Sequence, residues 1–202
     1  MKVLQGLSAG RIQFDILAKP KMTLDQHLNN SQHINKIKNG KYDIVMLQEQ
    51  SQTPAYRSNQ FYAASRKLDK IIKASGAKTA FYITWGRRGN SYESMQKSTT
   101  AAYEKMIKEL GAISVQVGAV WAEIKKKDAK LWYKLYTNDN SHPSRIGAFT
   151  NALVFISVLL NEKPENIKYD LQKLKQHKTE FVTEKIAKII ISCASNALQI
   201  NK

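Results

Sequence analysis

The sequence predicts an α/β fold: a three-layer α/β/α domain with a parallel, doubly wound sheet. Strand-like and helix-like hydrophobic patterns alternate four times along the 202 residues. One run, Ile44–Leu47, is continuously apolar, as is typical of a parallel strand buried on both faces. No internal repeat and no linker rich in Pro, Gly or Ser interrupts the chain, so residues 1–202 are expected to form a single domain.

The first half of the chain predicts two strands and two helices. Pro20 ends the first strand, and Thr23 and Gln26 have the spacing of a capping box that begins the first helix. Gly40 follows the last residue of that helix. The expected elements are a strand at 11–18, a helix from 24 to 39, a strand at 44–47, a polar loop at 48–57 and a helix at 59–75.

The second half continues the alternation and ends in helices. The expected elements are a strand at 79–85, a turn at 86–90, a helix at 92–110, a strand at 112–117, a short helix at 119–127, a loop at 138–144, a helix at 145–160 and, within a C-terminal extension at 171–202, a helix over 183–198. In doubly wound folds the chemistry lies in loops at the carboxyl ends of strands. Here those loops are 19–22, 48–57, 86–90 and the segment before Arg145.

Composition excludes several classes of protein. An apolar content of 43%, with 9% aromatic residues and only nine glycines, does not fit a disordered or fibrous chain. Cys193 is the only cysteine, so no intramolecular disulfide and no thiolate zinc cluster can form. Residues 152–160 are too short to span a bilayer, and no apolar run of signal-peptide length follows Met1. The chain as given is therefore expected to be cytoplasmic, without a membrane span.

The net charge of +16 suggests binding to nucleic acid, but most of the basic residues are lysines, which favours this hypothesis less. The 32 basic residues are 26 lysines and six arginines spread along the chain, against 16 acidic residues. Base readers and phosphate clamps favour arginine, because its planar fork makes two parallel hydrogen bonds. A solvated lysine surface is the preferred interpretation, and nucleic acid is not an expected partner.

The loop before Arg145 carries the most informative residues. Asp139 lies three residues before His142, a spacing that can place the carboxylate against Nδ1 of the imidazole and leave Nε2 free as a base. Ser144 can cap the following helix. The alternative is a surface turn with a solvated histidine and a capping serine, and spacing alone does not decide between the two.

Carboxamides follow the most apolar strand. Gln48 and Gln50 lie where that strand ends, and an amide N–H can stabilise an oxyanion without ionising. The alternative is that they satisfy the polar groups of the strand end. Trp85, at the end of the third predicted strand, could form the wall of an apolar pocket or belong to the core.

Three segments together resemble one family. They are Tyr42–Ser51 with its Leu-Gln-Glu-Gln-Ser end, Tyr82–Gly86 with Thr-Trp-Gly, and Asp139–Ser144 followed by Gly147. In this order, from about residue 11 to 170, the chain resembles the SGNH (GDSL-like) hydrolase superfamily, and within it a little-characterised bacterial branch. The resemblance implies a three-layer, flavodoxin-like α/β fold and hydrolysis of esters by a serine, a histidine and an aspartate, often on acylated carbohydrates. Members are often exported.

The resemblance also implies roles for particular residues. His142 corresponds to the general base and Asp139 to its orienting partner, with Ser141 beside them. Gln50 corresponds to the carboxamide oxyanion donor, with Gln48 as the alternative. The expected substrate is a small-molecule or carbohydrate ester. Neither a cofactor nor a metal is implied, because this chemistry needs neither.

Two departures from the family pattern change the expectation. Pro20 and Lys21 stand where the family has a glycine pair, so the second oxyanion donor is in doubt. Only ten residues precede Arg11, whereas the family needs a strand, a Gly-Asp-Ser or Gly-Asn-Ser turn and a helix there. We therefore expect the nucleophile block to be missing and esterase activity to be negligible.

Ser8 is the one candidate nucleophile, because Met1–Ser8 superficially resembles a strand followed by Gly-x-Ser. The preferred interpretation makes residues 2–7 the end of a helix with Gly10 at its C-cap. The rival function is a non-catalytic module that binds glycans or anionic ligands on the same scaffold. The remaining histidines, His27, His33 and His177, are expected to be solvated or packed.

Overall fold

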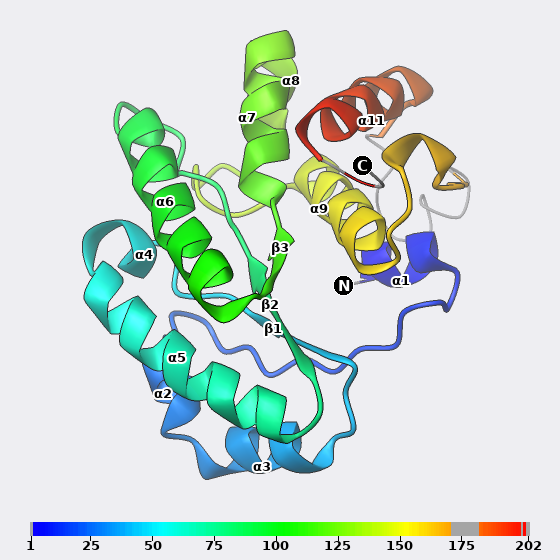
Figure 1. The fold of residues 1–202 in the computed structure, drawn as a ribbon. Helices are drawn as coiled ribbons and strands as arrows, with labels where there is room; N and C mark the ends of the chain where they lie inside the picture. The colour runs from blue at the N-terminus through cyan, green and yellow to red at the C-terminus, as the bar shows by residue number, and fades with distance from the viewer. Residues whose placement is uncertain (1, 171–181, 199, 201–202) are drawn as a thin grey trace. The chain divides into compact units, whose positions relative to one another are not determined.

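A computed structural model describes residues 2–170, 182–198 and 200 (Figure 1). The chain divides into two compact units. Unit 1 contains the residues up to Phe14, residues 87–90 and the residues from Gln116 onward, and unit 2 contains Asp15–Gly86 and Ser91–Val115. His177 and most of the segment that precedes the last helix lie outside the described residues.

The sheet belongs to unit 2 and is parallel. Its described strands are β1 (Ile44–Leu47), β2 (Lys78–Tyr82) and β3 (Ile113–Val115), in the order β1-β2-β3. Ile44 pairs with Lys78, and Ala80 pairs with Ile113. The predicted α/β class with a parallel sheet is confirmed, and the predicted bounds of β1 are those observed. The other two strands are shorter than predicted, and residues 83–85 follow β2 as irregular backbone.

The sheet is only partly buried, since Leu47 is buried but the other residues of β1 are half-buried, and several helices of unit 2 accompany it. They are α2 (Leu24–Leu28), α3 (Ser31–Asn39), α4 (Thr53–Tyr56), α5 (Ser58–Ala74) and α6 (Tyr92–Leu110). Figure 1 shows α5 and α6 side by side, and both contact β2. Phe61, Phe81 and Tyr103 meet there with ring centroids 4.7–5.9 Å apart and no exposed surface. This aromatic cluster is the centre of the core that carries the strand ends.

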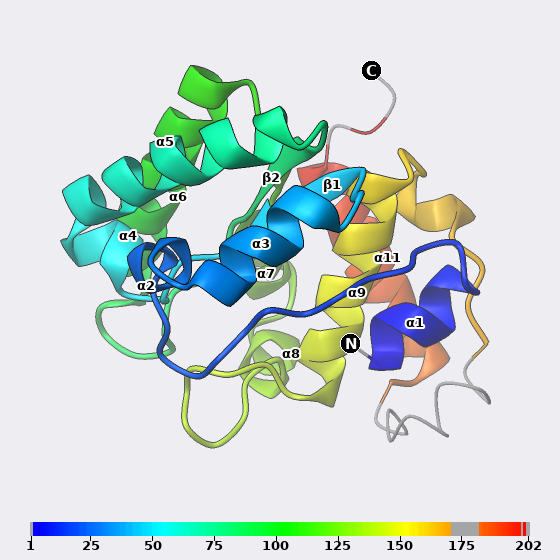
Figure 2. The same ribbon diagram turned by 90° about the horizontal axis from the view of Figure 1, so that it is seen from below.

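The capping signals in the sequence are confirmed, but the first predicted helix is two helices. Thr23 forms the predicted capping box with Gln26 at the start of α2, and Gly111 ends α6 with a φ of +61°. The single helix predicted over 24–39 is wrong, because the chain turns between α2 and α3 (Figure 2). Asn30 caps α3 by accepting a hydrogen bond from the His33 N–H, and this local bond competes with continuing the helix.

The strand predicted over residues 11–18 is also wrong. Residues 12–19 have irregular backbone, and Ile16 is 52% exposed. Asp15 is held instead by side chains, since the Tyr42 hydroxyl donates to it at 2.6 Å and Lys36 lies 3.1 Å away. A strand needs a neighbouring strand to satisfy its backbone, and among the described residues this segment has none.

Unit 1 is helical in its described part. Its elements are α1 (Lys2–Ser8), α7 (Val117–Lys127), α8 (Ala129–Lys134), α9 (Arg145–Leu159), the 3₁₀ turn η1 (Pro164–Asn166) and α11 (Glu184–Ala197). Helix α1 packs on α9, and α7 packs on α8 and α11. Two short helices were not predicted. One is α8, whose cap is the Asp128 side chain, which accepts a hydrogen bond from the Leu131 N–H. The other is α4, which lies in the predicted polar loop. No helix of the described residues is both long and apolar enough to cross a membrane.

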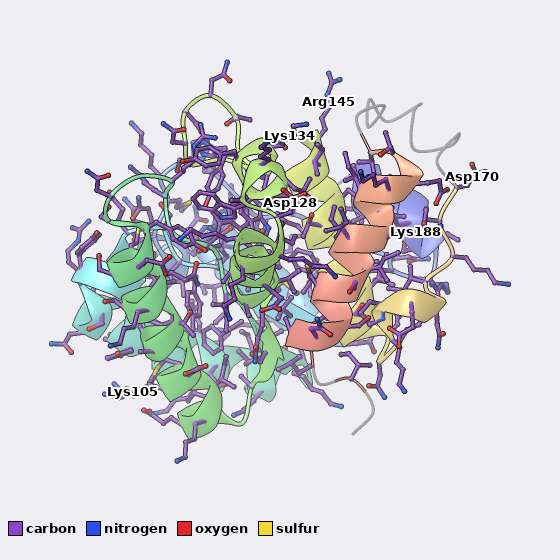
Figure 3. All side chains as sticks on the ribbon, turned by 90° about the horizontal axis from the view of Figure 1, so that it is seen from above. Lys105, Asp128, Lys134, Arg145, Asp170 and Lys188 are labelled. Carbon is purple, nitrogen blue, oxygen red and sulfur yellow. The ribbon has the colours of Figure 1, made fainter. Side chains whose placement is uncertain are left out.

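Lysines of unit 1 lie on its surface. Figure 3 labels Lys134, Arg145 and Lys188, all of which are exposed. In the densest basic run, Lys127 donates to Ser192 at 2.8 Å, and the Lys125 ammonium lies 5.4 Å from the centroid of the Trp132 ring. These two lysines of the run therefore contact neighbouring side chains of unit 1.

Candidate functional site

Asp139 and His142 meet in the loop between α8 and α9, within unit 1. Nδ1 of His142 lies 2.5 Å from Oδ2 of Asp139. The other carboxylate oxygen, Oδ1, accepts hydrogen bonds from the backbone N–H groups of Ser141 and His142, both at 2.9 Å, and from the Thr137 hydroxyl at 2.7 Å. Both oxygens are thus held, and one of them faces the imidazole.

These bonds decide the electrostatics of the pair. The hydrogen bond with the His142 ring, followed by the other donors, holds the pKa of Asp139 well below its usual range. The charged carboxylate favours the tautomer with the proton on Nδ1, which leaves Nε2 unprotonated. The His142 side chain is 77% exposed, and within the described part of the chain nothing is hydrogen-bonded to Nε2. The pair can therefore accept a proton from a hydroxyl that approaches from solvent.

The start of α9 fixes this loop from its other side. The Ser144 hydroxyl accepts from the Gly147 N–H at 3.2 Å, as predicted for a cap, and donates to the Lys134 carbonyl at 2.5 Å. A Cβ at position 147 would overlap the carbonyl oxygen of Leu135 and crowd the Trp121 ring. Glycine is therefore required where α9 approaches the end of α8.

The carboxyl end of β1, in unit 2, carries the predicted carboxamides. The Gln50 side-chain oxygen accepts from the Gln52 N–H at 3.0 Å and from the Thr53 hydroxyl at 3.2 Å. These two bonds orient the amide, and no described residue accepts a hydrogen bond from its Nε2. Gln48 differs, because its Nε2 donates to the Glu49 carbonyl at 3.1 Å. Gln50 therefore keeps both N–H donors of its amide for an oxyanion, whereas one of the two donors of Gln48 is already used.

Glu49, which lies between the two glutamines, is a polar residue of this strand end that the sequence reasoning missed. It is fully buried, and its Oε1 accepts from the Gln50 N–H at 2.7 Å and the Leu24 N–H at 3.2 Å. Its own N–H donates to the Tyr103 hydroxyl at 2.9 Å, while Oε2 has no partner among the described residues. Burial raises the pKa of this carboxyl. A carboxylate two residues after the most apolar strand was the signal available in the sequence.

Ser8 lies at the end of α1, in accordance with the preferred interpretation of residues 2–7. Its side chain is fully buried, and its hydroxyl donates to the Gln5 carbonyl at 3.3 Å. Gly10 follows with a φ of +79°. A hydroxyl inside a helix end, with no exposed surface, is not placed as a nucleophile for an ester that arrives from solvent.

The turn at Pro20 and Lys21 takes the backbone shape that a glycine would take. Lys21 has a φ of +63°, and the Met22 N–H donates to the Lys19 carbonyl at 3.2 Å. The lysine therefore occupies the left-handed region despite the cost that a side chain adds there. Lys21 retains a backbone N–H, whereas Pro20 has none.

Trp85 and Gly86 follow β2 and are buried. Trp85 is 7% exposed, and its ring lies 6.5 Å from that of Tyr82. The Gly86 N–H donates to the Gln96 side chain at 2.8 Å, and a Cβ on Gly86 would lie 2.8 Å from the Tyr92 carbonyl oxygen. These contacts place Trp85 in the core of unit 2.

Two histidines contact each other on α2 and α3. Nδ1 of His27 lies 2.9 Å from Nδ1 of His33, so one ring donates the proton that the other accepts. His33 is buried, and desolvation, followed by the nearby His33 and Lys19, lowers the pKa of His27. No group of three His, Cys, Asp or Glu side chains suited to a metal occurs in the described ranges of the chain.

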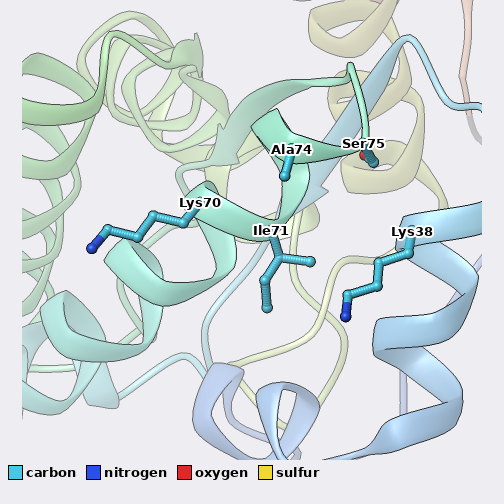
Figure 4. A pocket seen from close by; sticks show the side chains of 5 residues that line it. All are labelled: Lys38, Lys70, Ile71, Ala74 and Ser75. Carbon is cyan, nitrogen blue, oxygen red and sulfur yellow. The ribbon is translucent and has the colours of Figure 1, made fainter.

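A pocket of about 320 Å³ lies elsewhere in unit 2, between α3 and α5. Figure 4 shows Ile71 between Lys38 and Lys70, and Ala74 and Ser75 complete the lining. Both helices end there just before β1 and β2 begin, so this pocket lies at the amino ends of the strands. The candidate groups Gln50 and Glu49 lie at the opposite, carboxyl end.

Comparisons with known proteins identify the fold. No protein-family model matches the chain, and no curated protein sequence matches it. A proposed SGNH hydrolase from Slackia heliotrinireducens is 24% identical, with a TM-score of 0.69 over 78% of this chain and 89% of that one. A DUF4886 family protein from Bacteroides uniformis ATCC 8492 is 14% identical, with a TM-score of 0.70 over 88% of this chain and 79% of that one. The chain therefore has an SGNH-like fold, as its sequence motifs predict.

Proposed function

We propose that this chain carries the acid–base part of an SGNH-type ester hydrolase that acts on small-molecule or carbohydrate esters, including acetyl esters. The observation that carries the proposal is the bond between His142 and Oδ2 of Asp139 in an exposed loop, while Oδ1 of the same carboxylate accepts from three local donors. The similarity to a proposed SGNH hydrolase supports it.

In the proposed reaction His142 Nε2 accepts the proton of a serine hydroxyl as the oxygen attacks the ester carbonyl. It then returns that proton to the leaving alkoxide, and water repeats the cycle on the acyl-enzyme. Asp139 keeps Nδ1 protonated and stabilises the imidazolium. The free Nε2–H of Gln50 supports an oxyanion role for that residue, with Gln48 as the alternative donor.

The nucleophile is the weakest part of the proposal. Ser8, the candidate that the sequence offers, is buried in a helix end, and its hydroxyl donates to the Gln5 carbonyl, which weighs against a nucleophilic role. We therefore propose that the 202-residue chain hydrolyses esters weakly or not at all. Removing one member of a Ser-His-Asp triad leaves only about 10³–10⁴-fold acceleration over water in studied enzymes.

Turnover of p-nitrophenyl acetate tests these assignments in the chain, in His142→Ala and in Ser8→Ala. We expect weak turnover that Ser8→Ala leaves unchanged and His142→Ala lowers further. Robust turnover that Ser8→Ala abolishes would show that Ser8 is the nucleophile. Weak turnover that is the same in His142→Ala would remove the basis for the dyad as the catalytic base.

The DNA upstream of the Met1 codon gives a second test. An in-frame segment encoding a strand and a Gly-Asp-Ser or Gly-Asn-Ser turn would supply the serine, and the extended chain should then hydrolyse the ester in a His142-dependent way. An in-frame stop codon without another start would favour a non-catalytic module instead.

That alternative module would bind glycans or other anionic ligands. The exposed lysines and arginine of unit 1, such as Lys134, Arg145 and Lys188 (Figure 3), favour it. Retention on a heparin column that falls steeply with salt, and that survives His142→Ala, would support this function. Elution of the protein from this column at low salt would contradict the binding function and would indicate that the basic residues form only a solvated surface.

A further inference from the structure

The loop that carries the dyad folds back on itself around Asn140. The Thr137 N–H donates to the His142 carbonyl at 2.9 Å, and the Asn140 N–H donates to the Thr137 carbonyl at 3.1 Å. Asn140 has a φ of +60°, the left-handed shape that asparagine tolerates better than most residues. Since Asn140 lies between Asp139 and Ser141, its conformation sets the direction in which the Asp139 carboxylate faces the imidazole.

Arg88 holds Asn140 with both its backbone and its side chain, within unit 1. Its N–H donates to the Asn140 carbonyl at 2.9 Å, and its Nε donates to the Asn140 side-chain oxygen at 2.6 Å. Nη2 bonds to the same oxygen. Nη1 donates to the Tyr133 carbonyl at 2.9 Å, so one guanidinium connects the last turn of α8 to the residue beside Asp139.

An aromatic surface supports this guanidinium. Its central carbon lies 5.0 Å from the Tyr133 ring centroid and 5.6 Å from that of Tyr136. Tyr136 is buried against Trp121 and Trp132, at 4.8 and 5.3 Å between ring centroids. The Arg88 guanidinium therefore packs over aromatic rings that are themselves packed together, which reduces the side-chain entropy lost when it binds Asn140.

We propose that Arg88 is a positioning residue for the Asp139–His142 dyad, acting through Asn140. This inference rests on the proposed function for its catalytic meaning, but the geometry it explains is independent of any reaction. The planar fork places two donors on one amide oxygen while a third reaches Tyr133, and a lysine ammonium cannot reproduce this arrangement. Arg88 itself need not contact the substrate.

The tautomer of His142, measured from its ring ¹⁵N shifts by NMR, tests the proposal without a substrate. In the wild-type chain Asp139 should hold the neutral ring with the proton on Nδ1. In Arg88→Met we expect the ratio of the Nδ1–H to the Nε2–H tautomer to fall about tenfold, which corresponds to weakening one charge-assisted hydrogen bond. Arg88→Lys should give an intermediate ratio, and His142→Gln assigns the signals.

Arg66 offers a matched control. It also makes a two-bond fork, to Glu109 at 2.5 and 2.8 Å, on the surface of unit 2, so Arg66→Met should leave the His142 spectrum unchanged. A folded Arg88→Met with the wild-type tautomer ratio would overturn the proposal. If Arg88→Met does not fold, Asn140→Gly replaces it, because glycine keeps the positive φ and removes the acceptor of the fork. An unchanged ratio in Asn140→Gly would overturn the proposal equally.

The outcome separates this inference from the proposed function. A tautomer change in Arg88→Met establishes the positioning role even if the chain, or its extended form, hydrolyses no ester. If the extended chain is an active esterase, Arg88→Met should lower kcat with little change in KM, because the dyad acts on bound substrate.

Discussion

The carboxyl groups of Asp139 and Glu49 are held in similar ways and behave oppositely. Each has one oxygen that accepts hydrogen bonds from two backbone N–H groups. The second oxygen of Asp139 bonds to an imidazole at the surface, whereas that of Glu49 is buried and has no partner among the described residues. Hydrogen bonds lower the pKa of Asp139, and desolvation raises that of Glu49.

The difference shows what each region of the molecule requires. A charged carboxylate that orients a histidine must stay ionised, so an exposed loop rich in donors suits it. Glu49 instead connects the end of β1 to the start of α2 and, through its N–H, to α6. Its role is to hold three elements of unit 2 together, and burial makes that role more costly for an ionised group.

The largest expected effect tests whether packing, as well as polar bonds, holds the dyad loop. Gly147→Ala places a Cβ against the Leu135 carbonyl oxygen, so the backbone must shift and the free energy of unfolding should fall by about 3 kcal/mol. Urea unfolding monitored by tryptophan fluorescence measures it. Gly111→Ala is the control, since its φ is positive but its Cβ would meet nothing within 4 Å, and it should cost about 1 kcal/mol. Equal losses would refute steric crowding at Gly147.

The next effect concerns the buried carboxyl. Glu49→Ala leaves the buried N–H groups of Leu24 and Gln50 without their acceptor and should lower the free energy of unfolding by about 2–3 kcal/mol. Glu49→Gln keeps an acceptor oxygen and removes the ionisable group, so at pH 7 it should be much closer to the wild type. If the two variants are equally unstable in urea, the hydrogen bonds to Oε1 are not what stabilises this strand end.

The pH dependence of stability should separate the two carboxyl groups by sign. Glu49 has a raised folded-state pKa, so the folded chain binds the extra proton, and stability falls as pH rises from about 4.3 through the folded-state pKa. Asp139 has a lowered folded-state pKa, so its stability contribution is present above about pH 3.9 and is lost as pH falls below it. Glu49→Gln should remove the first trend and Asp139→Asn the second, as urea unfolding from pH 3 to 7 would show. Trends of one sign would contradict this contrast.

Local spacing predicted the dyad better than the elements around it. Asp139 bonds to His142, and Ser144 accepts from Gly147, each across three residues, so the sequence alone indicates these two bonds. Arg88 and Glu49 act on residues 52 and 25 positions away, and no periodicity reveals such contacts. The strand prediction for residues 11–18 was wrong for a related reason. Their apolar and polar residues alternate as in a strand, but the described structure contains no strand that pairs with them.

The ends of elements were also predicted only where the signal is local. The bounds of β1 were predicted because an apolar run between polar segments shows its limits directly. The break at Asn30 was missed because a cap inside a helical pattern resembles an ordinary polar position until its bond to His33 is seen.

The smallest expected effect concerns the turn at Lys21, compared with two other non-glycine residues at positive φ. Lys21→Gly removes the strain of a side chain at +63° but increases the entropy of the unfolded chain, so stability should change by less than about 0.5 kcal/mol. Lys41→Gly, at +51° in the same unit, is the matched control and should behave alike. Asn140→Gly, at +60°, should lose more stability, because the Asn140 side chain accepts a hydrogen bond from Arg88. The exposed Lys21 side chain has no comparable hydrogen bond to any described residue. Urea unfolding measures these changes in the free energy of unfolding. If Lys21→Gly lowers it as much as Asn140→Gly does, the turn at Lys21 depends on the lysine side chain, contrary to this expectation.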